Sequence, residues 1–593
     1  MSEALDLAPI GNCGVSALID REGRYVWACL PRVDGDPAFC RLLDADKPYG
    51  AWAMTLENQV STEQGYVRNT AVLRTVLTDK AGASIEILDL SPRHWRYGRL
   101  FRPAAYIRRV RPLSGVARLR VSLRPARNWG EAPCERTWGS NHIRFLGLPA
   151  GLRLTTNAPV SMVLDERPFR LEEELSFFLG PDEPFTGDVV DVCREMTEKT
   201  ILYWQAWVRT LALPLDYQEV VIRAAIALKL CVHEDTGAIV AALTTSVPEA
   251  PASGRNWDYR YCWLRDAYYV VQALTRLSAL DILERYLAFL RNLVGAAPSG
   301  HIQPVYGVGL ETDLTERIEP NLAGFKGMGP VRVGNAAYIQ HQHDVYGQVV
   351  LSSIHAFFDQ RLLRPATVQD FHDLEAVGER AFATHDQPDA GLWEFRTKQR
   401  VHTYSALMGW AACDRLGNAA AQLGLPERAD YWNGRALQIR TRIETEAWNA
   451  DLGRFAAGFG GDDLDASLLQ IVDLQFLDPT DQRYKATFSA IEAGLRRGAY
   501  LMRYAEPDDF GMPETAFNFC TFWFIEALHR AGRTEEARDL FEEMLRRRTH
   551  AGLLSEDMAT SDGVLWGNYP QTYSLVGLIN CAMMLSRPWG DVR

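Results

Sequence analysis

The spacing of apolar residues changes near residue 187, and this change most constrains the fold. Before it, short apolar or alternating runs are separated by turns at 20–23 and 79–82. The clearest runs are 14–20, 71–77, 84–90 and 117–123. Period-two alternation is typical of strands that bury one face, and many strands without intervening helices favour antiparallel layers. We therefore predict an N-terminal antiparallel β-sandwich over residues 1–186.

Residues 187–215 have helical spacing. The pattern ends before Pro214 and includes Val192, Met196, Ile201, Trp204 and Trp207. A proline ends a helix because it lacks the amide donor. We predict a helical linker between two domains.

Beyond Pro214 the pattern predicts helices almost throughout residues 216–593. The twelve candidates lie near 217–233, 264–278, 280–295, 344–361, 367–384, 401–416, 427–448, 465–476, 481–496, 514–531, 534–547 and 570–586. Several are apolar on nearly all sides, as inner helices of a closed assembly are. Twelve paired helices indicate a double ring of six inner and six outer helices. The long connections 234–263 and 296–343 are the expected carriers of functional residues.

Composition limits the class of partner. The formal charge of −12 excludes a nucleic-acid backbone or an anionic membrane as the expected partner and leaves small neutral substrates open. Neither a leader pattern nor an apolar run long enough for a membrane span is present, so we predict a cytoplasmic protein. The ten cysteines are scattered without paired spacing, which indicates reduced, buried thiols.

The stretch from Arg255 to Asp266 combines aromatic and charged residues in an unusual way. Rings stand at every second position, at Trp257, Tyr259, Tyr261 and Trp263. In an extended chain these rings share one face, with the charges opposite. Aromatic walls and an Arg–carboxylate pair, here Arg265 with Asp266, suit a carbohydrate pocket. The alternative is a buried aromatic hairpin with an ion pair.

Glycoside hydrolysis requires two carboxyl groups, one protonated donor and one ionised base. The sequence neighbours of two glutamates make these two residues the candidates. Glu394 lies between Trp393 and Phe395, and we expect these rings to desolvate it and raise its pKa. Glu556 follows Ser555 in a loop and is expected to be solvated and ionised. The alternative for either glutamate is a solvated loop charge.

Several motifs, in collinear order from about residue 8 to 585, resemble glycoside hydrolase family 15, the glucoamylase and trehalase family. They are 31–34, Asn256-Trp257-Asp258-Tyr259-Arg260-Tyr261-Cys262-Trp263-Leu264-Arg265-Asp266-Ala267, 330–337, Gly391-Leu392-Trp393-Glu394, His402-Thr403-Tyr404-Ser405, 513–517, Leu554-Ser555-Glu556 and Gly567-Asn568-Tyr569-Pro570-Gln571. One departure is Ser574-Leu575-Val576, where many bacterial members have His-Val after the serine.

The resemblance implies a β-sandwich followed by an (α/α)6 barrel, and inverting hydrolysis of terminal α-glucosides to β-glucose. It places Glu394 as general acid and Glu556 as general base. The predicted sugar-binding residues are Arg265, Asp266, Trp263, Trp393, Tyr261 and Arg332. Arg332 and the run Gln342-His343-Asp344 are pocket walls or structural residues, and Glu514 either belongs to the site or serves the first turn of a helix electrostatically.

The preferred function is an exo-acting α-glucoside hydrolase of glucoamylase or oligosaccharide glucohydrolase type, acting on a short neutral saccharide. Trehalase activity is the alternative within the family. A non-catalytic glycan-binding protein is a remote alternative, and a terpene-cyclase-like helical barrel rests only on Asp462-Asp463-Leu464-Asp465, which we interpret as a solvated loop. No cofactor and no metal is expected, although a response to phosphate or magnesium stays open for a trehalase, as does a homo-oligomeric state.

Overall fold

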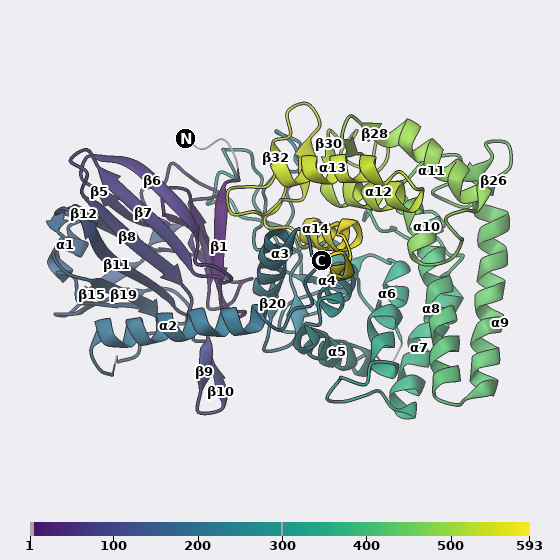
Figure 1. Cartoon of the computed structure of the whole chain (residues 1–593), viewed down its shortest axis with the longest axis horizontal. Helices are drawn as coiled ribbons and strands as arrows, with labels where there is room; N and C mark the ends of the chain where they lie inside the picture. Colours follow the sequence, from purple (N-terminus) through teal and green to yellow (C-terminus); the bar gives the residue numbers. More distant parts are fainter. Residues whose placement is uncertain (1–4, 185, 298–299, 593) are drawn as a thin grey trace.

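The computed structural model describes residues 5–184, 186–297 and 300–592. Two antiparallel sheets form the N-terminal part, at the left of Figure 1. The seven-stranded sheet has the order β1 (Leu7–Gly11), β2 (Ser16–Asp20), β3 (Tyr25–Leu30), β5 (Ala51–Leu56), β12 (Arg118–Arg124) and β18 (Phe169–Arg170), with β4 (Asp36–Phe39) paired to β3. The eight-stranded sheet has the order β15 (Glu135–Trp138), β16 (His142–Leu146), β17 (Leu152–Thr156), β19 (Leu175–Gly180), β11 (Tyr106–Ser114), β8 (Ser84–Leu90), β7 (Leu73–Asp79) and β6 (Gln59–Tyr66).

The alternation seen in the sequence sets which face of these strands is buried. In β12 the apolar positions Leu119, Val121 and Leu123 are buried while Arg118 and Arg120 are exposed. The interior holds packed rings, with the ring of Tyr25 lying 5.1 to 5.9 Å from those of Trp52, Tyr106 and Phe39. The four predicted runs correspond to β2, β7, β8 and β12, so the sheet-rich N-terminal part is confirmed.

Helix α2 (Val189–Val208) follows the sheets, as the spacing predicts. The side chain of Asp188 caps its first turn by accepting hydrogen bonds from the amides of Val190 and Asp191. Cys193 and Val189 pack against residues of the eight-stranded sheet, and Figure 1 shows the helix running along the lower side of the strands. The helix is therefore part of the N-terminal core as well as a connection.

The C-terminal part holds twelve α-helices among the described residues. They are α3 (Gln218–Leu230), α4 (Leu264–Arg276), α5 (Leu280–Gly295), α6 (Asp344–Ser353), α7 (Val368–Thr384), α8 (Thr403–Gln422), α9 (Pro426–Arg442), α10 (Gln470–Asp473), α11 (Gln482–Leu495), α12 (Asn518–Arg530), α13 (Thr534–Arg546) and α14 (Thr572–Leu585). A short α1 (Val160–Leu164) lies among the strands.

Short elements complete the chain. The 3-10 helices are Ala336–Ile339, Ile354–Phe357, Ala466–Leu469 and Trp589–Asp591, and a π-helical turn spans Ile443–Ala447. The remaining strands are β9 (His94–Arg96), β10 (Arg99–Phe101), β13 (Ala126–Arg127), β14 (Ala132–Pro133), β20 (Val232–His233), β21 (Ala238–Ile239), β22 (Cys262–Trp263), β23 (Val305–Tyr306), β24 (Arg317–Ile318), β25 (Arg332–Val333), β26 (Trp448–Asn449), β27 (Arg454–Phe455), β28 (Arg496–Arg497), β29 (Tyr500–Leu501), β30 (Thr515–Phe517), β31 (Asp557–Ala559) and β32 (Leu565–Trp566).

The helical prediction needs two corrections. The candidate 514–531 begins only at Asn518, because residues Thr515–Phe517 pair as β30 with β31. The candidate 465–476 is a 3-10 turn followed by the four-residue α10. Successive elements are in contact: α4 contacts α6, α6 contacts α8, and α8 contacts the 3-10 turn before α10. That turn contacts α12, α12 contacts α14, and α14 contacts α4. These helices therefore meet in a closed circuit.

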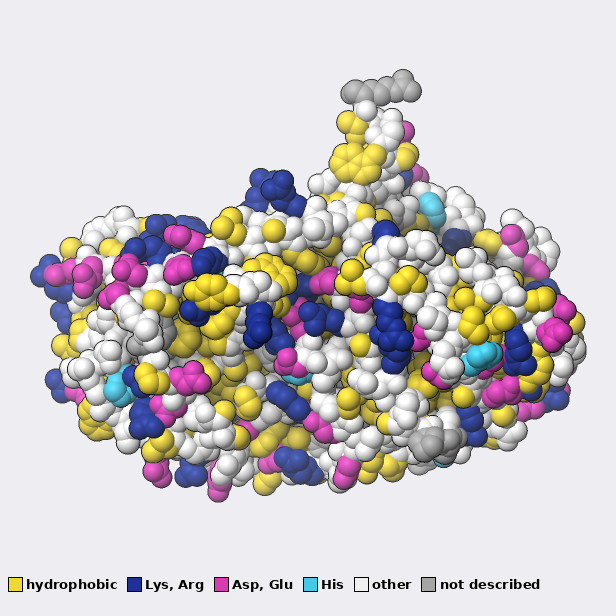
Figure 2. Space-filling view, turned by 90° about the horizontal axis from the view of Figure 1, so that it is seen from below, with side chains coloured by type: hydrophobic (Ala, Val, Ile, Leu, Met, Phe, Trp, Pro, Cys, Tyr) yellow, Lys and Arg dark blue, Asp and Glu magenta, His cyan; other side chains and the backbone are white. Residues whose placement is uncertain are grey.

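The surface carries both signs of charge. On the face seen in Figure 2, Lys and Arg side chains are mixed with Asp and Glu, and hydrophobic side chains are scattered between them. The net charge of −12 is therefore not gathered into one acidic area on this face. None of the helices in the described ranges is both long and apolar enough to cross a bilayer.

A buried ion pair joins the two parts of the chain. Arg260 and Asp258 are paired at 2.7 Å and their side chains are fully buried. The Arg260 guanidinium also donates to the carbonyl of Gly35 at 2.8 Å and lies 4.8 Å from the ring of Trp129, both in the N-terminal part. The centre of the aromatic stretch is thus fixed to the sheets.

Replacing Asp258 by Asn should destabilise the protein by about 3–5 kcal/mol, because it leaves Arg260 buried without its partner charge. Denaturation by urea, followed by tryptophan fluorescence, measures the change. The matched control is Glu535→Gln, which breaks an exposed pair with Arg538 and should cost about 1 kcal/mol or less. Equal midpoints for the two variants would show that the buried pair is dispensable.

Candidate active site

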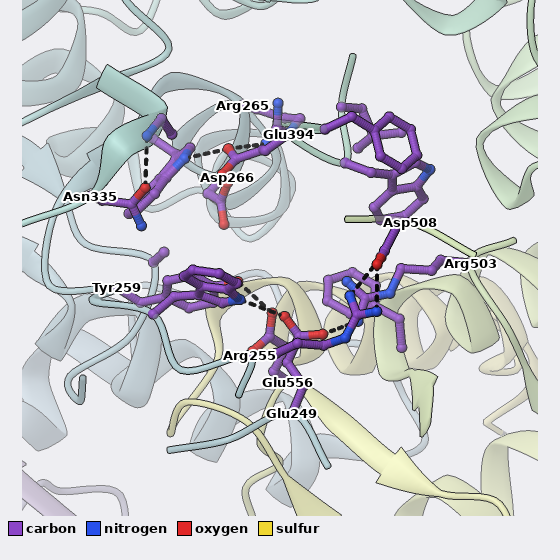
Figure 3. A pocket seen from close by; sticks show the side chains of 18 of the residues that line it. Glu249, Arg255, Tyr259, Arg265, Asp266, Asn335, Glu394, Arg503, Asp508 and Glu556 are labelled. Carbon is purple, nitrogen blue, oxygen red and sulfur yellow. Dashed lines mark hydrogen bonds and ion pairs between the residues drawn. The ribbon is translucent and has the colours of Figure 1, made fainter. Parts of the chain in front are cut away.

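A pocket opens where several loops of the helical part meet. Its empty volume is about 850 Å3, counting the open solvent at its mouth. Both long connections contribute to its lining, the first through Trp257 and Tyr259 and the second through Asn335 and Gln340. Glu394 and Glu556, 162 positions apart in the chain, both line it. Figure 3 shows them on opposite sides of the cavity.

Three of the four rings of the aromatic stretch reach the pocket, and the fourth does not. Trp257, Tyr259 and Trp263 line it. Tyr261 is instead buried among Val305 and other apolar residues, and its hydroxyl accepts a hydrogen bond from the amide of Gly334 at 3.2 Å. The predicted place of Tyr261 against the sugar is therefore wrong, because its ring packs in a buried cluster with Trp263 and Tyr259 and is absent from the pocket lining.

Glu394 is held at one carboxylate oxygen. Its Oε1 accepts from the indole of Trp263 at 2.6 Å, from Arg265 at 3.0 Å and from Gln342 at 3.2 Å. The other oxygen, Oε2, takes no part in these bonds. The backbone of Glu394 has φ +61°, a left-handed conformation that costs a non-glycine residue about 1 kcal/mol or more and is often found at active sites.

The rings on either side of Glu394 in the sequence are oriented by other partners. The indole of Trp393 donates to Asp465 at 2.6 Å, and Phe395 stacks on His402 with ring centroids 5.9 Å apart. Both rings line the pocket, but the ring that contacts the carboxylate of Glu394 by a hydrogen bond is Trp263.

Arg265 and Asp266 lie in the first turn of α4, yet they do not form the predicted pair. The Arg265 guanidinium contacts Glu394 at 3.0 Å, Asp344 at 3.3 Å and Gln342 at 2.7 Å. Asp266 lines the pocket separately, and burial raises its pKa to about 7, although Arg265 and a hydrogen bond from Tyr573 oppose the rise. Removing Asp266 would therefore leave Arg265 with its anionic partners, contrary to the sequence prediction.

Glu556 is almost completely buried, with 2% of its surface exposed. The hydroxyl of Tyr259 donates to its Oε1 at 2.6 Å. Burial raises the pKa of Glu556 well above its ordinary value, and the nearby carboxylates of Glu249 and Asp557 raise it further. The expectation of a solvated Glu556 is wrong, and its burial beside Asp557 and the distant Glu249 opposes ionisation of its carboxyl.

Sequence reasoning missed Glu249. It is 3% exposed, lines the pocket, accepts from the indole of Trp257 at 2.9 Å and is paired with Arg503. Arg503 also lies 3.8 Å from Asp557. Glu249 stands in the run Val247-Pro248-Glu249-Ala250-Pro251, which has no periodicity or motif, so no local signal marks it.

Other predicted residues lie behind the pocket or away from it. Arg332 is absent from its lining and donates to the carbonyls of Gly254 and Asn256, with its guanidinium 4.7 Å from the ring of Trp257. Glu514 is exposed and precedes β30, so it serves no helical turn. Asp465 is 3% exposed, which contradicts its interpretation as a solvated loop residue.

Neither a metal site nor a disulfide is seen in the described part of the chain. Within it, no group of three or more His, Cys, Asp or Glu side chains is arranged to hold a metal ion. All ten cysteines are buried and unpaired. The pocket lining itself offers carboxylates, arginines and aromatic rings.

Residues 216–583 match the family model described as Glycosyl hydrolases family 15. The chain belongs to this family.

Related proteins cover nearly the whole length. The trehalase of Thermoplasma volcanium is 30% identical over 586 residues, covering 97% of this chain and 92% of that protein. The trehalase of Mycobacterium tuberculosis is 30% identical over 624 residues, covering 98% and 89%. The crystal structure of a bacterial glucoamylase complexed with acarbose aligns with a TM-score of 0.68 at 13% identity, covering 98% and 94%. The last likeness shows the fold, which confirms a glucoamylase-like arrangement of a sheet-rich part followed by a helical part.

The raised pKa of Glu556 predicts how stability depends on pH in this family 15 glycosidase. The pKa of this carboxyl is higher in the folded protein than its ordinary value of 4.5. Its protonated form therefore contributes fully to stability below pH 4.5, and this contribution is lost as the pH rises through the folded pKa. Glu556→Gln cannot ionise. Its stability advantage over the wild type should therefore be larger at pH 8 than at pH 5.

Thermal unfolding at both pH values measures this advantage. The control is Glu514→Gln at an exposed site, which should show the wild-type pH dependence. Because the pKa of Asp557 is also raised, the slope should be reduced and not abolished. Parallel curves for Glu556→Gln and wild type would contradict the raised pKa.

Proposed function

We propose that the protein is an inverting α,α-trehalase, which hydrolyses trehalose to one molecule of β-glucose and one of α-glucose. Membership of glycosyl hydrolase family 15 supports the reaction class. The curated relatives reported above are both named trehalase, which favours trehalose over the glucoamylase-type substrates first expected from the sequence. The glucoamylase-type activity is the second candidate, supported by the likeness of fold to a bacterial glucoamylase.

The observation that carries the proposal is the pair of carboxylates on one pocket. Glu394 and Glu556 are joined by two rings in edge contact, since Trp263 donates to Glu394, Tyr259 donates to Glu556 and their ring centroids are 5.4 Å apart. Inverting hydrolysis needs an acid on the leaving oxygen and a base that takes a proton from water on the opposite face of the sugar. Carboxylates on opposite sides of the cavity fit this need (Figure 3).

We assign Glu394 as the general acid and Glu556 as the general base from their places in the family motifs. With Oε1 of Glu394 held by three donors, Oε2 is free to deliver the proton to the glycosidic oxygen. A carboxylate whose pKa is raised takes a proton from water more readily than an ordinary carboxylate. In the reverse assignment Glu556 would be the acid and Glu394 the base. Only the raised pKa of Glu556 favours it, because a general acid must be protonated before it reacts.

The remaining predicted binding residues fit the reacting sugar. The pocket lining beside Glu394, here called the inner site, includes Asp266, Arg265, Trp263 and Trp393. We propose that they bind the glucose whose bond is broken, with Asp266 accepting from its hydroxyls.

The proposal extends to architecture and location. We propose that the two sheets form a β-sandwich domain over residues 1–186, that 187–215 link the domains, and that the closed circuit of helices is the inner ring of an (α/α)6 barrel in 216–593. A reducing compartment such as the cytoplasm is supported by ten buried, unpaired cysteines. Self-association stays a prediction.

Substrate comparison tests the function. Trehalose should be hydrolysed with kcat/KM at least tenfold above maltose and isomaltose, and proton NMR before mutarotation should show equal amounts of α- and β-glucose. A retaining mechanism would give only α-glucose from trehalose. A preference for maltose would favour the glucoamylase-type activity.

Leaving-group dependence decides between the two assignments. Glu394→Gln should lower kcat/KM for trehalose by about 100-fold or more but should spare α-glucosyl fluoride, whose leaving group needs little protonation. Glu556→Gln should depress both substrates, since each needs the activated water. Kinetics of both variants on both substrates give the answer, and the opposite pattern would exchange the roles.

A further inference from the structure

Residues 504–512, here called the outer loop, form part of one wall of the pocket. The loop connects β29 to β30, and its residues Asp508, Asp509 and Phe510 line the pocket. Figure 3 shows Asp508 across the cavity from Asn335 and Tyr259. The proposed acid, base and inner site include no residue of this loop.

One end of the outer loop is tied to the aromatic stretch. Arg255 forms a two-pronged ion pair with Asp508, both bonds 2.6 Å long, and donates to the carbonyl of Gly511 at 2.9 Å. The side chains of both charged residues are less than one-tenth exposed. The hydroxyl of Tyr504 also donates to Asp508. Two-pronged Arg–carboxylate bonds fix orientation as well as distance, so the loop is held in one place.

Other hydrogen bonds hold the loop to the segment that follows Glu394. Asp509 accepts from the backbone amides of Arg396 at 2.6 Å and Thr397 at 3.1 Å, and Lys398 donates to the carbonyl of Pro507 at 2.5 Å. Asp508 and Asp509, the loop carboxylates that line the pocket, are therefore occupied in holding the loop against its neighbours. The group left to face a ligand from this loop is the ring of Phe510, which is 38% exposed.

Phe510 forms a rigid aromatic corner with Trp257. The two rings meet edge to face, with centroids 5.1 Å apart. Trp257 is itself fixed by its indole bond to Glu249 and by the guanidinium groups of Arg332 and Arg396, each 4.7 Å from its ring. A fixed apolar corner between polar walls suits the CH face of a sugar ring.

We propose that Phe510 and Trp257 form the wall of the subsite for the second sugar, and that the pinned outer loop limits substrates to two sugar rings. This inference rests on the proposed trehalase function. An enzyme that trims long glucans must let the rest of the chain leave the pocket, whereas trehalose has no further residues to accommodate. A loop that is hydrogen-bonded to two neighbouring segments along the pocket wall fits an enzyme for trehalose.

The test compares trehalose with trehalose that carries a bulky substituent on C6 of one ring. Only the unmodified ring fits the inner site, so the substituted ring must meet the outer wall. Phe510→Ala should raise KM for trehalose about tenfold with kcat changed less than about threefold, because contact with the second ring is lost. It should also raise the ratio of kcat/KM for substituted over plain trehalose about tenfold.

The matched control is Phe358→Ala, since Phe358 is 45% exposed and absent from the pocket lining. It should leave both KM and the ratio unchanged. Asp509→Asn keeps the ring of Phe510 but weakens the hydrogen bonds that hold the loop. It should raise the ratio of kcat/KM for substituted over plain trehalose by a smaller factor. Phe510→Leu replaces Phe510→Ala if thermal unfolding shows that the alanine variant does not fold.

The outcomes separate the two proposals. Wild-type activity on trehalose with an unchanged ratio in Phe510→Ala would overturn the role of the loop alone. A loss of kcat with KM and ratio unchanged would do the same, since it would make Phe510 a support for the catalytic groups. Absence of wild-type activity on trehalose would overturn the proposed function and this inference with it.

Discussion

The complete burial of Arg260 constrains the active site more than any other single interaction. A guanidinium removed from water must have its donors satisfied, and Arg260 achieves this with Asp258, with the Gly35 carbonyl and with the sulfur of Cys29. These partners fix which way the backbone of the aromatic stretch faces. Trp257 and Tyr259, on either side of Asp258 in the chain, line the pocket. The sheets thereby position one wall of a site built mainly from the helical part.

The two carboxylates sit in opposite electrostatic surroundings, and this asymmetry has a cost. Glu394 contacts the cation Arg265, whereas Glu556 shares a buried region with the acids Glu249 and Asp557. The cations near these acids are Arg503 and Arg255. Burying three acids together opposes folding. Burial and the carboxylates of Glu249 and Asp557 raise the pKa of Glu556.

Periodicity predicted the scaffold well because strands and helices bury regular faces. The runs at β2, β7, β8 and β12 and most helices were identified this way. It failed where pairing overrode the local pattern, as at Thr515–Phe517, which extend to join β31. Motifs located Glu394, Glu556, Arg265 and Asp266 in one pocket.

The surroundings of these residues could not be predicted, because they come from distant segments. Glu249 and Arg503 lie 254 positions apart yet form one ion pair. Tyr261 was assigned to the sugar because strict alternation was assumed, whereas the chain leaves the extended form at this point and buries the ring. Glu556 was judged by its neighbours in sequence, and the acids that raise its pKa include Glu249, far away in the chain.

The outer loop is bonded to the segments that carry Glu394 and Tyr259. Asp509 binds the amides of Arg396 and Thr397, which follow Glu394 within three residues, and Asp508 binds Arg255, which begins the stretch that carries Tyr259. A displacement of the loop therefore pulls on the backbone that sets Glu394 and on the backbone that sets the Tyr259 bond to Glu556. If Glu394 and Glu556 act as we propose, a third sugar ring that pushed the loop outward would disturb both groups together, and the exclusion of longer substrates would act on the chemical step as well as on binding.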